Sequence, residues 1–108
     1  HDEAYMSFGL MGGGVQAQGH VQFLLNHFVW GMDVQEAIDA PRFRHYDGQR
    51  VALELPIDDR TREALSVMGH VIIDQPMSVF GGAQAIVRLT KGFAAGSDPR
   101  KDGMAVGY

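Results

Sequence analysis

The residues with the clearest capacity for chemistry lie between Phe8 and His20, where glycines follow a short apolar stretch. The run Gly9-Leu10-Met11-Gly12-Gly13-Gly14 is expected to connect a strand to a helix, which gathers free backbone N–H groups near the positive end of the helix dipole. Such a cluster binds an anion, which can be a phosphate, a carboxylate or the oxyanion of a tetrahedral intermediate. Gly12 and Gly13 suit this role because they lack a Cβ atom and accept unusual φ angles.

The spacing of these glycines leaves open what they bind. The run matches neither the dinucleotide-binding fingerprint, whose first glycine spacing is missing, nor the phosphate loop, because no Gly-Lys-Ser/Thr follows. Taken alone, the glycines are interpreted most simply as a tight connection between a strand and a helix.

The other reactive side chains do not form a complete active site. The histidines lack the spacing of zinc ligands with a third donor nearby, and no serine stands in a Gly-x-Ser-x-Gly context. Asp98, which precedes a proline, is expected to accept backbone N–H bonds in a turn, and Glu36 and Asp39 are expected to be solvated on one helix face. We therefore expect no metal and no cofactor. The residues considered are His1, His20, His27, His45, His70, Ser7, Ser66, Ser78, Ser97, Thr61 and Thr90.

Composition places the chain among ordinary globular proteins. It has 108 residues, of which 45% are hydrophobic and 20% charged, with a net charge of −4. The absence of a basic patch argues against nucleic acid or an anionic membrane as the partner, and no apolar stretch is long enough to span a bilayer. Without cysteine, disulfides and thiolate chemistry are excluded. The start shows no signal peptide and no initiator methionine, so we expect a fragment, a processed chain or an excised domain.

Helical signals dominate the first half of the chain. A strand is expected from Ala4 to Leu10. It is followed by a helix that ends near Gly31, because apolar residues recur at i, i+3, i+4 and i+7. Asp33 and Glu36 form a capping box that opens a short helix, which Pro41 ends. The apolar face of the first helix is expected to carry Val21, Leu24, Leu25 and Phe28.

The second half alternates strands with one helix. Val51, Leu53 and Leu55 alternate with Ala52 and Glu54, which is typical of a half-buried strand. A helix capped by Asp58 or Asp59 and ended by Gly69 follows, and the later strands predict a layered α/β or α+β domain. Those strands are expected at Val71-Ile72-Ile73, at Ala83 to Leu89 after the turn Phe80-Gly81-Gly82, and at Phe93 to Gly96 after the turn Lys91-Gly92.

Taken together, the sequence resembles the C-terminal part of the small subunit of gamma-glutamyltranspeptidases, a family with cephalosporin acylase-like relatives. The resemblance covers essentially all 108 residues, and several long sequence segments occur in the family's order. These segments are Gly9-Leu10-Met11-Gly12-Gly13, Gln16-Ala17-Gln18-Gly19-His20-Val21-Gln22, the run from Gly31 to Phe43, Gly69-His70, Gly81-Gly82-Ala83-Gln84-Ala85-Ile86, Ala95-Gly96-Ser97-Asp98-Pro99-Arg100 and Gly107-Tyr108.

The resemblance implies the C-terminal portion of an N-terminal-nucleophile αββα sandwich, with short helices on a mainly antiparallel sheet. It implies a precursor that cuts itself and exposes a threonine, whose attack on a γ-glutamyl carbonyl gives an acyl-enzyme. By position, the oxyanion-hole N–H groups correspond to Gly12 and Gly13, and Gly81-Gly82 to a strand-entry turn packed near the site. The nucleophile, the supporting second threonine and the serines that hold the substrate carboxylate lie upstream of this chain.

This resemblance leaves two enzymatic interpretations and one non-enzymatic one. Residues 1–108 are expected to belong either to a γ-glutamyl transferase or hydrolase acting on glutathione-like amides, or to a cephalosporin or glutaryl acylase-like amidase. Gly14-Val15 favours the acylase-like branch, since many relatives carry serine and arginine there. By itself the chain is expected to be an inert assembly domain that packs against its missing segments and self-associates, as a dimer. A small-anion binding module is a third, weaker idea, and the compartment stays open.

Overall fold

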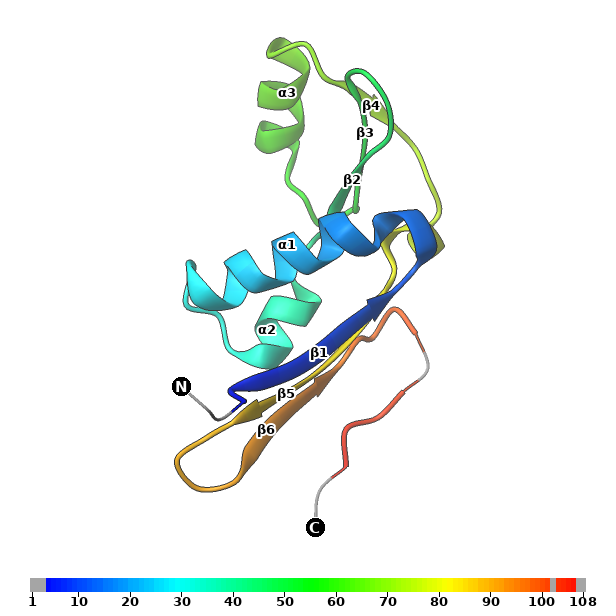
Figure 1. Ribbon diagram of the computed structural model, residues 1–108. Coiled ribbons are helices and arrows are strands. Elements are labelled where there is room, and N and C mark those ends of the chain that lie inside the picture. Colours follow the sequence, from blue (N-terminus) through cyan, green and yellow to red (C-terminus); the bar gives the residue numbers. More distant parts are fainter. Residues whose placement is uncertain (1–3, 102, 107–108) are drawn as a thin grey trace.

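The computed structural model describes residues 4–101 and 103–106 and shows an elongated molecule of 47 × 27 × 23 Å. Its strands form two separate three-stranded sheets, of order β1-β5-β6 and β2-β3-β4 (Figure 1). The elements are β1 Met6–Met11, η1 Gly13–Val15, α1 Gln16–Phe28, α2 Val34–Asp39, β2 Phe43–His45, β3 Arg50–Leu53, α3 Asp59–Val67, β4 Val71–Ile73, η2 Met77–Phe80, β5 Gly82–Arg88 and β6 Phe93–Ser97. The predicted α/β class with short helices on antiparallel strands is confirmed.

The first sheet is wholly antiparallel, and β5 is its central strand. Helices α1 and α2 cover one of its faces (Figure 1). The core between sheet and helices is small and apolar, as burial of hydrocarbon surface requires. It contains Leu10, Val15, Phe23, Val34, Ala37, Ile38, Ala83, Ala85 and Val87.

Local signals explain the ends of several elements. The capping box at Asp33 is present: its carboxylate accepts from the N–H of Glu36 at 2.8 Å, and the Glu36 side chain accepts from the N–H of Asp33 at 3.2 Å. Asp58 is the N-cap of α3 and accepts from the N–H of Thr61 at 2.7 Å. Satisfying these free N–H groups is what fixes where a helix begins.

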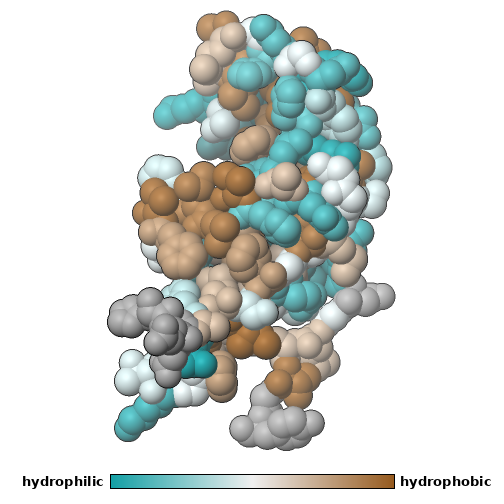
Figure 2. All heavy atoms as spheres, viewed as in Figure 1, coloured by the Kyte–Doolittle hydropathy of each residue, from teal (hydrophilic) through white to brown (hydrophobic). Residues whose placement is uncertain are grey.

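Of the predicted apolar face of α1, this chain partly buries Leu24 against the core and leaves the other three residues exposed. Phe23 is 2% exposed, whereas Val21, Leu25 and Phe28 are 45–59% exposed. The helix also begins at Gln16, before the predicted apolar pattern. Figure 2 shows apolar surface gathered over the end of α1 and the turn after it, where Val29 and Trp30 are exposed.

A strand over Val51–Leu53 is confirmed, but the prediction that it is half-buried and extends to Leu55 was wrong. Val51, Ala52, Leu53 and Glu54 are all buried, and Leu55, beyond the end of β3, is 91% exposed. The strand is central in the second sheet, pairing antiparallel with β2 and parallel with β4. Parallel pairing and strand β2 were not predicted. A strand covered on both faces has no apolar alternation.

Candidate active site

The glycine bend joins the end of β1 to the start of α1. Gly12 has φ 139° and Gly13 has φ 59°, angles that favour glycine, and both residues are exposed. Neither N–H group donates to a carbonyl of another described residue. The bend closes through the N–H of Val15, which donates to the Gly12 carbonyl at 3.4 Å, and through that of Gln16, which donates to the Gly13 carbonyl. Open N–H groups at this corner can receive an anion.

A positive charge lies beside this bend. The Arg44 guanidinium donates to the Val79 carbonyl at 3.1 Å and stacks on the Tyr46 ring, 4.8 Å from its centroid. One of its nitrogens lies 2.8 Å from the point that a Cβ on Gly14 would occupy. Any side chain at position 14 would displace this guanidinium. In its present place, the charge of the guanidinium adds to the attraction of the bend for an anion.

Gly81 packs directly against the bend. Its φ is +77°, and a Cβ added there would collide with the Met11 carbonyl oxygen and lie 2.8 Å from Leu10 Cδ2. A Cβ on Gly12 would in turn lie 3.0 Å from Gly81 Cα and 2.6 Å from Val15 Cγ1. The two backbones therefore touch without side chains between them. The predicted turn from Gly81 into the strand is confirmed, since β5 begins at Gly82.

Four buried charged side chains join the two sheets behind this bend. Arg42 donates to Asp98 at 2.6 Å, and Arg100 donates to Asp98 at 2.9 Å and to Glu54 at 2.5 Å. All four side chains are at most 8% exposed. Asp98 also accepts from the N–H groups of Ala83 and Arg100. Its predicted structural role is confirmed, while its partners were not predicted.

The balance of burial and partners sets the ionisation of this cluster. Burial alone would raise the pKa of Asp98, but the N–H groups of Arg100 and Ala83 and the charges of Arg42 and Arg100 lower it below its usual value. The pKa of Arg42 is lowered, first by burial and then by the nearby Arg100 charge. The pKa of Arg100 is raised, because hydrogen bonds and charges of Glu54 and Asp98 outweigh its burial. The pKa shifts of Asp98 and Arg100 therefore favour their charged forms, while that of Arg42 opposes its charged form.

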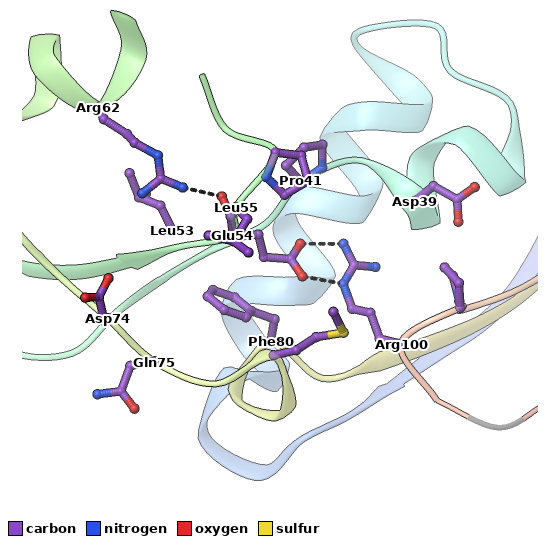
Figure 3. Close-up of a pocket in the computed structure, with 13 residues that line it drawn as sticks. Asp39, Pro41, Leu53, Glu54, Leu55, Arg62, Asp74, Gln75, Phe80 and Arg100 are labelled. Carbon is purple, nitrogen blue, oxygen red and sulfur yellow. Dashed lines mark hydrogen bonds and ion pairs between the residues drawn. The ribbon is translucent and has the colours of Figure 1, made fainter. Parts of the chain in front are cut away.

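A cavity of about 330 Å³ opens on the other side of this cluster. Figure 3 shows the paired Glu54 and Arg100 at the cavity, with Phe80 beneath and Asp39, Asp74 and Arg62 around it. Arg62 lines the cavity and donates to the carbonyls of Glu54 at 2.6 Å and Ile57 at 2.9 Å. None of the bend glycines lines this cavity, so the cavity and the open N–H groups are separate features.

The remaining candidate side chains have structural surroundings. His27 bonds to the Met32 carbonyl and Tyr5 hydroxyl, and His45 to the Gly48 carbonyl. His20 lies edge-on to Phe8 with its Nε2 buried, and His70 has a buried Nδ1. Within residues 4–101 and 103–106, no group of three acidic or histidine side chains could hold a metal ion, and no helix is long and apolar enough to cross a bilayer. His1 lies outside the described residues.

The layered architecture is that of an N-terminal-nucleophile hydrolase domain. It superposes on the gamma-glutamyltranspeptidase of Pseudomonas nitroreducens, in a structure of its W525D mutant, with a TM-score of 0.90, over 99% of this chain and 57% of that one. At 23% identity this likeness shows the fold alone. The family model described as gamma-glutamyltranspeptidase matches residues 1–108. The chain therefore belongs to the gamma-glutamyltranspeptidase family, and the resemblance found in its sequence is confirmed.

Two relatives are more similar in sequence. The chain is 34% identical to the glutathione hydrolase-like YwrD proenzyme of Bacillus subtilis, over 93% of this chain and 21% of that protein. It is 39% identical to a cephalosporin acylase from Bacillus halodurans, with a TM-score of 0.85, over 90% of this chain and 19% of that one. The chain spans about a fifth of the length of these proteins, so it corresponds to a fragment of a larger protein.

Proposed function

We propose that residues 1–108 are the C-terminal segment of a gamma-glutamyltranspeptidase small subunit, and that the Gly12 and Gly13 N–H groups form its oxyanion hole. The observation that carries this proposal is the open bend, where both N–H groups lack a protein acceptor among the described residues. Two adjacent amides facing one point stabilise the oxygen that becomes negative when a carbonyl is attacked. The guanidinium of Arg44 beside Gly14 increases that stabilisation.

The attacking group comes from the part of the protein outside this chain. In this proposal a threonine freed by self-cleavage attacks the γ-glutamyl carbonyl, with its own α-amine as base, and forms an ester. The amine leaves with a proton, and water or an acceptor amine then takes the acyl group. The bend would hold the oxyanion in both steps, because each passes through a tetrahedral intermediate.

An acylase-like amidase is the second candidate. It is favoured by the 39% identity to the Bacillus halodurans cephalosporin acylase and by Gly14-Val15, which stands where many family members are expected to carry serine and arginine. The Arg44 guanidinium occupies the space that a side chain at position 14 would take, so a residue larger than glycine there would displace it. The two candidates share the oxyanion hole and differ in the acyl group, so substrate competition separates them.

The experiment uses the full-length protein. We expect it to cut itself into two chains and to release a coloured amine from a γ-glutamyl anilide, while a glutaryl anilide measures the acylase alternative. Mass spectrometry of the new N-terminus identifies the nucleophile. The 108-residue chain alone should release no amine, because it lacks the attacking group. A fully self-processed protein that turns over neither anilide would contradict the proposal, as would hydrolysis by the isolated chain.

Self-association of the isolated chain remains a prediction, and its physical basis is the bare face of α1. Val21, Leu25 and Phe28 on this helix and Trp30 in the turn after it are 45–70% exposed, and water-exposed apolar patches favour association. We expect the chain to sediment as a dimer, and the change Leu25→Glu to shift it toward monomer. The change Leu55→Glu, at a residue 91% exposed away from this helix, is the control. A monomer at all concentrations would show the idea to be wrong.

A further inference from the structure

The turn at Phe80-Gly81-Gly82 is hydrogen-bonded on both sides to the buried charge cluster. Arg42 donates through one nitrogen to the carbonyls of Phe80, at 3.1 Å, and Gly81, at 3.4 Å. Asp98 accepts from the N–H of Ala83 at 2.9 Å, two residues further on. Arg42 and Asp98 are themselves paired at 2.6 Å with almost no exposure. One buried ion pair therefore fixes the peptide groups on either side of Gly81-Gly82.

The same turn is the surface on which the bend rests. Gly82 pairs with Met11 at the last position of the β1–β5 ladder, directly before Gly12. A Cβ added to Gly81 would collide with the Met11 carbonyl oxygen, and a Cβ added to Gly12 would lie 3.0 Å from Gly81 Cα. Because the backbones are in contact, a shift of the turn moves the bend as well.

We propose that Arg42 and Gly81 are positioning residues for the Gly12–Gly13 oxyanion site: Arg42 fixes the turn, and Gly81 transmits its position to the bend. This inference rests on the proposed function. Neither residue touches the reacting atoms. Their effect is confined to the tetrahedral species, because only that species requires the two N–H groups to be accurately placed.

Arg100 provides a matched control for Arg42. It belongs to the same cluster, is also nearly inaccessible, and donates to Asp98, Glu54 and the carbonyls of Ile38 and Ala40. It does not contact the carbonyls of Phe80 or Gly81. Gly92 is the control for Gly81, because its φ is +89° and a Cβ there would meet nothing within 4 Å.

The test compares Arg42→Lys with Arg100→Lys, and Gly81→Ala with Gly92→Ala, in the full-length self-processed protein. The first readout is kcat and KM for the anilide that the wild type cleaves. The second is the ratio of the inhibition constants of two ligands. One ligand is a boronic acid with the same acyl group, which forms a tetrahedral adduct, and the other is the product acid. Arg42→Lys and Gly81→Ala should lower kcat at least about tenfold with little change in KM, since a misplacement near 1 Å costs about 10²-fold. Boronate binding should weaken by a similar factor, and product binding should not.

The controls should leave the ratio of boronate to product binding within about twofold, a change too small to reflect a displaced donor. The inference is overturned if Arg42→Lys and Arg100→Lys lower kcat equally with an unchanged ratio, which is the result expected of a purely structural cluster. If Arg42→Lys does not fold, Gly81→Ala decides, because it leaves every charge in place; an unchanged ratio there also overturns the inference. A wild type that cleaves no anilide refutes the proposed function instead.

Discussion

The change Gly12→Ala should lower kcat of the full-length protein by about 10²–10³-fold, the usual cost of losing one oxyanion-hole donor. A Cβ at this position would lie 2.6 Å from Val15 Cγ1 and 3.0 Å from Gly81 Cα. Val15 is completely buried, so neither neighbour can move away cheaply. The φ of 139° is also one that alanine rarely adopts. The bend must therefore rearrange, and its N–H groups turn away from the oxyanion.

The matched control for this prediction is Gly48→Ala. Gly48 has φ 51°, and a Cβ there would meet nothing within 4 Å, so the change carries backbone strain without a collision. Steady-state kinetics on protein whose self-cleavage has been checked by gel separates the two effects. We expect KM to change little for Gly12→Ala, because the substrate carbonyl needs the N–H groups less than the oxyanion does. Equal losses of kcat in the two variants would show that the bend has no catalytic role.

The change Asp98→Ala should cost about 3–5 kcal/mol of stability, the usual loss when one partner of a buried ion pair is removed. Without Asp98, two guanidinium groups remain buried near each other, and the Ala83 N–H loses its acceptor. The full-length protein should unfold at clearly lower denaturant concentration. Asp47→Ala is the control, since the Asp47–Arg50 pair is more than half exposed, and such pairs contribute below about 1 kcal/mol.

The Asp98 carboxylate also makes the stability of the folded protein depend on pH in the acid range. Its pKa is lower in the folded protein than the value of about 3.9 expected in the unfolded chain. Its contribution is therefore complete above that value and is lost as pH falls through the folded pKa. Unfolding midpoints measured between pH 6 and pH 2 should fall steeply in the wild type below about pH 4, and less steeply in Asp98→Ala. Parallel curves would contradict this role.

Elements with local signals could be predicted from the sequence. The caps at Asp33 and Asp58 and the turn at Gly92 depend on residues within three positions of one another, so the chain itself shows them. The bend at Gly12 and Gly13 was found in the same way. Its catalytic role came from the family resemblance and stays a prediction, because spacing alone cannot tell an anion site from a tight connection.

Features set by distant partners could not be predicted. Arg42 and Asp98 are 56 residues apart, and no local pattern pairs them. One signal was available: Glu54 interrupts the apolar run after Val51, and a charge in such a run must find a partner when it is buried. The failure to predict which face of α1 is buried has a related cause. An apolar stripe shows that a helix has something to bury against, without showing whether this chain supplies it.

The distances along the chain within the charge cluster have a consequence for synthesis on the ribosome. Glu54 and Arg42 emerge 46 and 56 residues before the partners Arg100 and Asp98 that neutralise them. At about 5–20 residues per second, that interval lasts seconds, far longer than chain collapse needs. Until it ends, burying either charge is costly, and the first sheet still lacks its strands β5 and β6, so the two sheets cannot dock on the nascent chain. The late arrival of Asp98 and Arg100 thus times the assembly of the support beneath the bend.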